Sequence, residues 1–164
     1  MREFRRRRYR GPGELLRDVQ GLLAQRALIR STMRGGMDPA FRERLMLVVT
    51  GVNDCRYCSY GHARMALSEG ISEEEVEMLA EMAFEGSPAE EVPALLYAQH
   101  WAESDGQPDP AVRASVEARY GEETLQRIEV ILRMIRAANL LGNTFDYVLH
   151  RVSFGRLGSA RRGA

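Results

Sequence analysis

The two cysteines are the residues of this sequence with the clearest capacity for chemistry. They are the only cysteines in the 164-residue chain and stand three positions apart, as Cys55 and Cys58. In a reducing compartment a C-x-x-C pair is typically redox-active or metal-binding rather than structural. The spacing therefore predicts either a redox-active dithiol or part of a metal site.

The predicted helix around the cysteines favours redox chemistry. Asn53 or Asp54 can cap a helix over residues 55–68, which puts both thiols in its first turn. Unpaired backbone N–H groups and the helix dipole stabilise a thiolate there and lower its pKa. Residues three apart on a helix have Cβ atoms about 5–6 Å apart, whereas a disulfide prefers roughly 3.5–4.5 Å. A disulfide is therefore feasible with local adjustment and should be easily reduced.

A histidine and a glutamate extend this pair. His62 follows Cys58 by four residues, so the thiols and the imidazole share one stripe of the predicted helix. If a preceding helix forms an antiparallel hairpin with it, Glu43 is level with His62 across the turn. A carboxylate beside an imidazole raises its basicity and orients it. The pattern predicts a proton relay in which Glu43 orients His62, His62 is the base and Cys58 is the nucleophile.

Other interpretations of these four residues stay open. A zinc site would need His62 and Glu43 to complete a ligand set with the cysteines, and a site along one helix face would be unusual. The cysteines could instead be incidental buried thiols, and His62 a core or capping histidine. Glu43 could be a surface residue that is ion-paired with Arg42 or Arg44.

The rest of the sequence predicts helices and no sheet. Apolar residues recur with helical spacing from end to end, and clear alternation with a period of two is absent. Capping and turn residues divide this pattern into about six to eight helices, so the fold class is a single-domain all-α bundle. The remaining helices are expected over residues 13–32, over about 39–52, from Ser72, from Ser87, over 109–121 and over 122–153.

Charge is partitioned along the chain although its total is zero. All 23 basic residues are arginine, against 23 acidic residues, so mechanisms that require a lysine are excluded. Arginines concentrate in residues 1–44 and 130–164, whereas residues 45–129 carry 17 of the 23 acidic side chains. Ends of one sign around a middle of the other predict self-association, or ends that fold over an acidic body.

The chain divides into a basic N-terminal arm (residues 1–12), the helical domain (13–154) and a flexible tail (155–164). A nucleic-acid-binding arm is disfavoured, because one tyrosine accompanies its arginines and no base-reading motif follows. A solvated or subunit-contacting arm is preferred. No apolar segment suits a secretory signal or a membrane span, so we expect a cytoplasmic protein without membrane contact.

The segment from the glutamate to the histidine resembles a known family. The helix that precedes the cysteines and the Ala-Arg-Met-Ala-Leu-Ser-Glu-Gly segment that follows them contribute to this likeness, which is best over residues 38–83. In this chain the segment reads Glu43-x11-Cys55-x2-Cys58-x3-His62. This pattern is similar to the signature of the AhpD-like alkylhydroperoxidases within the carboxymuconolactone decarboxylase family.

The resemblance implies an all-helical fold, assembly as homotrimers or homohexamers, and thiol-dependent reduction of hydroperoxides. By this likeness Cys58 would be the peroxidatic thiolate that passes through a sulfenic acid, and Cys55 would resolve it as a disulfide. His62 and Glu43 would move the proton. The electrons would come from an external dithiol, such as a lipoyl group or a thioredoxin-like protein, with no bound cofactor or metal.

Two features separate this chain from parts of that family. The alkylhydroperoxidase pattern has a second histidine between the cysteines, where this chain has Tyr57, which bears on its efficiency as a peroxidase. Family members that decarboxylate lactones lack the cysteine pair, so its presence argues against that activity. The alternatives are a decarboxylase-like lyase acting on a small lactone or acid, and a non-enzymatic redox-sensing or binding protein.

Overall fold

Eight α-helices and one π-helical turn form the regular structure of residues 4–158, the part of the chain that the computed structural model describes. No strand occurs among these residues, so the predicted all-α fold class is confirmed. None of their helices is both long and apolar enough to cross a membrane. The helices are α1 (Pro12–Ala24), α2 (Arg26–Ser31), α3 (Pro39–Asn53), α4 (Arg56–Ser68), α5 (Glu73–Ala80), α6 (Val92–Glu103), α7 (Pro110–Tyr120) and α8 (Glu122–Val152).

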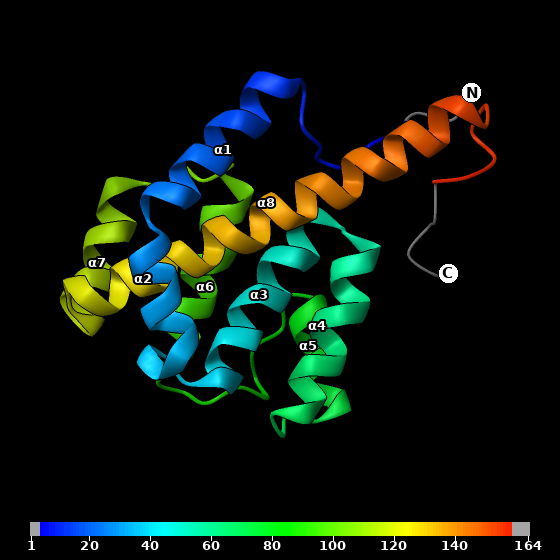
Figure 1. The fold of residues 1–164 in the computed structure, drawn as a ribbon. Coiled ribbons are helices and arrows are strands. Elements are labelled where there is room, and N and C mark those ends of the chain that lie inside the picture. Colours follow the sequence, from blue (N-terminus) through cyan, green and yellow to red (C-terminus); the bar gives the residue numbers. More distant parts are fainter. Residues whose placement is uncertain (1–3, 159–164) are drawn as a thin grey trace.

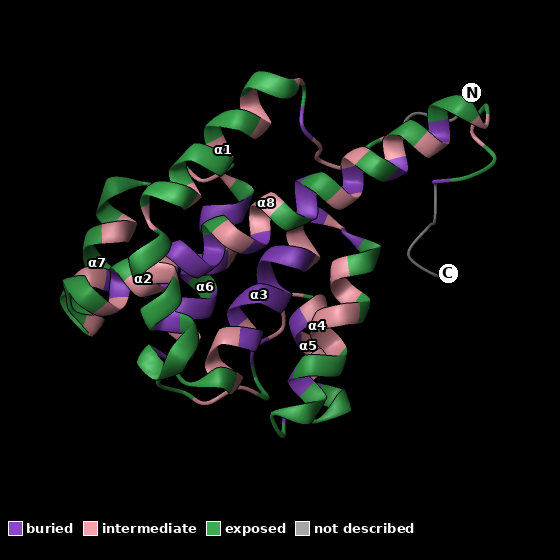
Figure 2. Cartoon of the chain, viewed as in Figure 1, coloured by how far each residue is buried: buried purple, intermediate pink, exposed green. Residues whose placement is uncertain are grey.

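Helix α3 lies at the centre of the fold and contacts α4, α5, α6 and α8. Asp38 caps it by accepting a hydrogen bond from the backbone N–H of Phe41 (2.9 Å), and Pro39 suits its first turn. Because neighbours surround α3, apolar side chains are buried on successive positions rather than on one stripe (Figure 2). These residues are Leu45, Met46, Leu47, Val48 and Val49.

Helix α8 is the longest element and runs diagonally across the molecule (Figure 1). Its buried residues are apolar from Leu125 to Ile135. Beyond Ile135 the buried face becomes polar apart from Leu140, and its members are Asn139, Asn143, Asp146 and His150. Buried polar groups need hydrogen-bond partners, so this half of α8 must face polar groups from elsewhere in the chain.

The N-terminal arm supplies some of these partners. Tyr9 is buried, and its backbone N–H donates to Oγ1 of Thr144 on α8 (3.1 Å). Arg6 forms an ion pair with Asp146 (2.7 Å). The expectation of a solvated arm is therefore wrong for Arg6 and Tyr9, which contact α8 of their own chain, whereas Arg5 and Arg10 are exposed. Contact of the arm with another subunit stays a prediction.

The N-terminal helices differ from the sequence prediction. The single helix expected over residues 13–32 is divided at Gln25, whose backbone leaves the helical conformation (φ −97°, ψ 11°). The π-helical turn Thr32–Gly36 follows α2, and Gly35 within it has a φ of 108°, which favours glycine. The apolar stripe continues across Gln25, which explains why the periodicity predicts one helix.

Capping residues locate two later helices correctly and one incorrectly. The side chains of Ser72 and Asp109 accept backbone hydrogen bonds at the starts of α5 and α7, as predicted. The helix expected from Ser87 begins instead at Val92, with Pro93 in its first turn. Proline is compatible with that position because the first-turn N–H groups have no partner within the helix. Residues 159–164 of the predicted tail and residues 1–3 of the arm lie outside the described residues.

Candidate active site

The two cysteines lie where α3 ends and α4 begins. Asp54 has a left-handed backbone (φ 53°, ψ 47°) that turns the chain out of α3. Cys55 is the N-cap of α4, and its Sγ accepts a hydrogen bond from the backbone N–H of Cys58 (3.4 Å). The expectation that Asn53 or Asp54 caps this helix is therefore wrong. Asn53 stays in α3, where its side chain donates to Asn139 (3.2 Å).

The two thiols differ in burial and in pKa. Cys55 is fully buried, Cys58 is half-buried, and both are free. The pKa of Cys58 is lowered to about 7: a hydrogen bond from the Cys55 thiol is the largest cause, burial acts against it, and hydrogen bonds from Asn139 and from the backbone N–H of Cys58 add to the lowering. The same thiol–thiol hydrogen bond, together with burial, raises the pKa of Cys55. Cys58 is thus the accessible thiol that ionises near neutral pH, while Cys55 keeps its proton.

His62 and Glu43 are in contact, as the antiparallel hairpin predicts. Nδ1 of His62 lies 2.7 Å from Oε2 of Glu43, and the Glu43 side chain is only 5% exposed. Glu43 is therefore not a surface residue, although it does form the predicted ion pair with Arg42, at 3.8 Å. Arg44 pairs with Glu75 instead. A carboxylate at Nδ1 favours the tautomer with its proton on that nitrogen, which leaves Nε2 as the basic nitrogen.

The four predicted residues form two pairs rather than one continuous chain. Cys55 is hydrogen-bonded to Cys58, and Glu43 is hydrogen-bonded to His62. Within residues 4–158 no hydrogen bond links His62 to Cys58. His62 follows Cys58 by one turn of α4, so the two pairs lie on the same stripe of that helix. Over the same described range, no three His, Cys, Asp or Glu side chains are grouped so as to hold a metal ion.

Helix α8 passes very close to the cysteines at Gly142. A Cβ atom at this position would lie 2.9 Å from Sγ of Cys55 and 3.4 Å from Cδ2 of Tyr57. A separation below 3.0 Å is essentially never seen for real Cβ atoms. Only glycine therefore allows α8 to cover Cys55 at this distance, and α8 stays continuous through this position.

Asp146 of α8 holds the two residues that separate the cysteines. Its Oδ1 accepts hydrogen bonds from the Arg56 guanidinium (2.6 Å) and the Tyr57 hydroxyl (2.7 Å). Its side chain has no exposed surface, and Oδ2 pairs with Arg6 of the arm. Sequence reasoning missed this residue. The one available indication was that Asp146 is the single acidic residue of the arginine-rich segment 130–164.

Asn139 is a second residue of α8 that sequence reasoning did not place at the site. It is fully buried, and its Nδ2 donates to Oγ1 of Thr50 on α3 (3.1 Å). Its Oδ1 accepts a hydrogen bond from Asn53, two residues before Cys55. No local spacing relates an asparagine of the last helix to residues of α3, so the motif could not reveal these contacts.

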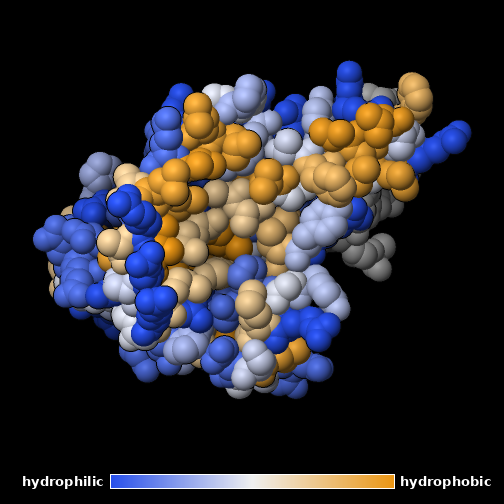
Figure 3. Space-filling view, viewed as in Figure 1, coloured by the Kyte–Doolittle hydropathy of each residue, from blue (hydrophilic) through white to orange (hydrophobic). Residues whose placement is uncertain are grey.

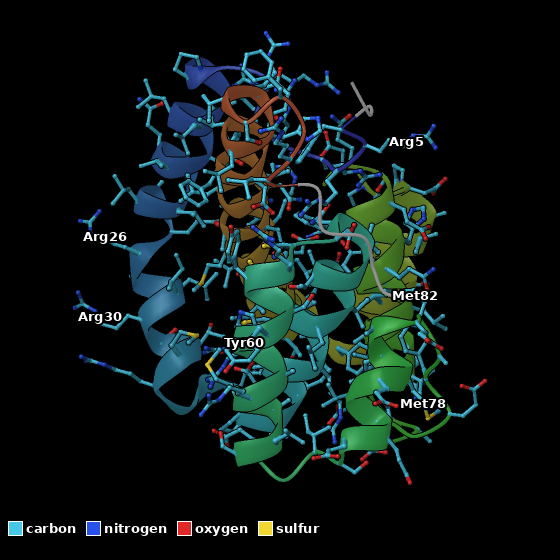
Figure 4. The ribbon with its side chains drawn as sticks, turned by 90° about the vertical axis from the view of Figure 1, so that its right-hand side faces the viewer. Arg5, Arg26, Arg30, Tyr60, Met78 and Met82 are labelled. Carbon is cyan, nitrogen blue, oxygen red and sulfur yellow. The ribbon has the colours of Figure 1, made fainter. Side chains whose placement is uncertain are left out.

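Aromatic side chains are exposed beside the cysteine segment. Tyr60 lies on the outer face of α4, where 68% of the residue is accessible, and it is labelled in Figure 4. Tyr57 is also exposed, and its ring centroid is 6.1 Å from that of Phe145 on α8. The half-buried thiol of Cys58 therefore lies in a segment whose accessible surface is partly aromatic.

This helical arrangement can now be compared with known proteins. The profile of the Carboxymuconolactone decarboxylase family matches residues 19–104, which is more than half of the chain. The chain belongs to this family. AhpD-like proteins are among the family's members, which are often enzymes. No curated protein and no solved structure matches the chain significantly.

In this member of the carboxymuconolactone decarboxylase family, the matched segment ends near the end of α6. It therefore contains both cysteines and the Glu43–His62 pair. Helix α8, with Asn139, Gly142 and Asp146, lies outside the matched segment. The family match thus covers the four residues predicted from the sequence, and the contacts from α8 are additions that the structure reveals.

Proposed function

We propose that this family member is an AhpD-like thiol peroxidase that reduces hydroperoxides with Cys58 and Cys55. The observation that carries the proposal is the asymmetry of the two thiols. Cys58 is accessible and has its pKa lowered to about 7, and the adjacent Cys55 is buried with its pKa raised. A thiolate nucleophile beside a protonated thiol provides both reactants that a two-cysteine peroxidase needs.

The first step of the proposed reaction is attack of the Cys58 thiolate on the terminal peroxide oxygen. An S–O bond forms while the O–O bond breaks, so the sulfur is oxidised to a sulfenic acid and the peroxide is reduced to an alkoxide. The alkoxide takes up a proton and leaves as the alcohol. In this proposal His62, oriented by Glu43, delivers that proton as a general acid.

The second step is attack of Cys55 sulfur on Cys58 sulfur. An S–S bond forms, and the hydroxyl group of the sulfenic acid leaves as water with the proton of the Cys55 thiol. An external dithiol, of the lipoyl or thioredoxin-like type, then returns two electrons and two protons and is itself oxidised to a disulfide. The Cys55–Cys58 pair of the protein is the redox centre in this scheme. The scheme requires no bound cofactor and suits a reducing cytoplasm.

Peroxide consumption with dihydrolipoamide as the added reductant tests this function. We expect Cys58→Ser to lose the activity. Cys55→Ser is the matched control: it should react once, give a sulfenic acid that a dimedone tag detects by mass at Cys58, and then form no intramolecular disulfide. Activity that survives Cys58→Ser unchanged would contradict the assignment of Cys58 as the nucleophile.

A decarboxylase-like lyase is the second candidate function. The observation that favours it is the Glu43–His62 pair, which forms a buried, oriented base without any contribution from the cysteines. On this alternative both cysteine variants would turn over a small lactone or carboxylic acid as well as the wild type does. His62→Ala would abolish that turnover, so the same set of variants separates the two functions.

We also propose that the chain assembles as a homotrimer or homohexamer. Apolar side chains gather along α8 and α1 on one face of the molecule (Figure 3). The members of this patch on the second half of α8 recur at helical spacing and are each at least half exposed: Leu141, Phe145, Val148 and Val152. Contiguous exposed apolar surfaces of this kind typically mark interaction sites.

A further inference from the structure

An open cavity lies between the N-terminal arm and α8. The arm runs from the start of α1 towards the second half of α8 (Figure 1), and the cavity beside it has a volume of about 370 Å³. Five of its nine lining residues are arginines: Arg6, Arg7, Arg8, Arg10 and Arg136. Binding sites for small molecules typically measure about 300–1,000 Å³. The size of the cavity therefore suits a small molecule, and its arginines suit an anion.

Two of these arginines already have carboxylate partners. Arg6 forms its ion pair with Asp146 (2.7 Å). Arg136 contacts three carboxylates: Asp105 (2.7 Å), Asp18 (2.8 Å) and Glu14 (3.7 Å). Asp105 and Glu14 are the acidic residues of the cavity wall, so Arg136 binds the negative charge that the wall contains.

Arg7 and Arg8 hold the arm in place without using a carboxylate. Both terminal nitrogens of Arg7 donate to backbone carbonyl groups at the end of α6, those of Ala102 and Glu103. Arg8 donates to the backbone carbonyl of the next residue (3.0 Å), and its guanidinium carbon lies 3.7 Å from the centroid of the Tyr147 ring. Carbonyl groups and an aromatic face fix these two guanidinium groups but do not neutralise their charges.

Arg10 has the least committed side chain of the five. The residue is exposed, and its guanidinium makes no hydrogen bond or ion pair within residues 4–158. Its position is nevertheless defined, because its backbone N–H donates to Oε2 of Glu14 (2.9 Å). Arg7, Arg8 and Arg10 therefore give the cavity wall three positive charges that no carboxylate of the described residues pairs with.

The geometry of a guanidinium group favours phosphate as the anion. Each guanidinium has five N–H donors in a planar fork, and the contacts above use at most two of them in Arg7 and one in Arg8. A terminal phosphate group presents three acceptor oxygens, so it can bind three guanidinium groups at once, whereas a carboxylate presents two. Charge-assisted contacts of this kind are about twice as strong as neutral hydrogen bonds.

We propose that this cavity binds a small phosphate-bearing molecule through Arg7, Arg8 and Arg10. The site exists because the arm folds back on its own chain: Arg6 and Tyr9 anchor the arm to α8, and Arg7 anchors it to the end of α6. The ligand is then bound by guanidinium groups alone, in keeping with a chain that contains no lysine. The inference does not depend on the proposed thiol chemistry.

Isothermal titration calorimetry of the full chain with inorganic pyrophosphate tests this site. The salt concentration should be about 0.15 M, where exposed charges further apart than about 8 Å are largely screened. We expect saturable binding of one pyrophosphate per chain. Arg10→Gln should raise the Kd roughly tenfold, because it removes one charge-assisted contact. The Arg10 side chain has no partner within residues 4–158, so this variant should fold as the wild type does.

The matched control is Arg30→Gln, which removes the same charge from an exposed arginine of α2 that projects away from the molecule (Figure 4). It should bind pyrophosphate with the wild-type Kd. A wild-type protein that does not bind pyrophosphate would overturn the inference. Equal losses of affinity in Arg10→Gln and Arg30→Gln would also overturn it, because the binding would then reflect the overall charge of the chain.

Malonate is the probe for the other class of anion. It is a compact dicarboxylate, and we expect it to bind more weakly than pyrophosphate because each of its groups has fewer acceptor oxygens. Malonate binding at least as tight as that of pyrophosphate would overturn the assignment to phosphate. The assay contains no peroxide and no reductant, so failure of the anion site would leave the proposed peroxidase function untouched.

Discussion

At Gly142 the absence of a single Cβ atom decides how closely α8 can cover Cys55. The position is helical and has an ordinary backbone, so the requirement for glycine is purely a matter of space. Gly61 on α4 is a useful contrast, because a Cβ atom there would meet nothing within 4 Å. Substitution by alanine at these two helical glycines is therefore expected to change the stability of the protein in opposite directions.

We expect Gly142→Ala to destabilise the protein by about 1–3 kcal/mol, since the added methyl group overpacks against Cys55 and Tyr57. Gly61→Ala should raise the free energy of unfolding by about 0.5–1 kcal/mol, because alanine loses less backbone entropy in a helix. Urea unfolding of both variants measures the difference. Equal effects of the two substitutions would show that α8 does not press on Cys55.

Glu43 provides the test of the proposed proton relay. We expect Glu43→Gln to slow peroxide consumption roughly 10–100-fold, because the neutral amide no longer supports a charged His62 during proton transfer. The initial rate at saturating reductant measures this effect. Glu129→Gln is the control: it alters a carboxylate bound by Tyr97 and Arg113 far along α8 and should leave the rate within about twofold. Equal rates for Glu43→Gln and wild type would exclude the proton relay.

At the level of the element, α8 changes character along its length. Its first half buries apolar residues, as an amphipathic helix of a globular domain does. Its second half buries polar residues that bind the cysteine segment and the N-terminal arm. Asp146 joins all three parts, because it holds Arg56, Tyr57 and Arg6 at the same time.

We expect Asp146→Asn to lower the free energy of unfolding by about 3 kcal/mol, because removing the charge of a buried carboxylate leaves the nearly buried Arg6 guanidinium without its counter-ion. The arm should also become more sensitive to limited proteolysis. Glu123→Gln is the control, since its carboxylate is 79% exposed in an ion pair with Arg127 and should contribute less than about 0.5 kcal/mol. If Asp146→Asn lowered the free energy of unfolding no more than Glu123→Gln does, Asp146 would not bind the arm to α8.

At the level of the whole molecule, the second half of α8 has an apolar outer surface and a polar buried surface. Leu141, Phe145, Val148 and Val152 point outward on the half of the helix whose buried residues are polar. A chain that kept this surface in water would expose a continuous apolar stripe beside its candidate active site. Assembly of several copies through this stripe would remove it from water, which is the physical basis of the proposed homo-oligomer.

We expect Val148→Asp to dissociate the assembly, since a charge buried in an apolar interface is strongly unfavourable. Sedimentation velocity of the purified protein measures the change in mass. Leu96→Asp on α6 is the matched control, because Leu96 is 52% exposed, close to the 50% of Val148, but lies away from the stripe. A wild-type protein that sediments as a monomer would contradict the proposal directly.

The sequence was sufficient where the relevant residues are close along the chain. Both cysteines and His62 share one helix, so their common stripe follows from helical geometry alone. Glu43 could be added because a short hairpin between α3 and α4 relates positions symmetrically about the turn. The all-α class likewise followed from periodicity, which is a local property of the chain.

Only the tertiary structure decided what surrounds these residues. Asn139, Gly142 and Asp146 contact residues 53–57 because α8 packs against α3 and α4, and no spacing within the sequence encodes these contacts. The exact cap of α4 also depended on packing, since Asn53 stays helical while its amide bonds to Asn139. Local patterns identify which side chains can react, and the local hydrogen bond between Cys55 and Cys58 is the largest cause of the difference in their pKa values. Long-range packing determines how deeply each of these side chains is buried.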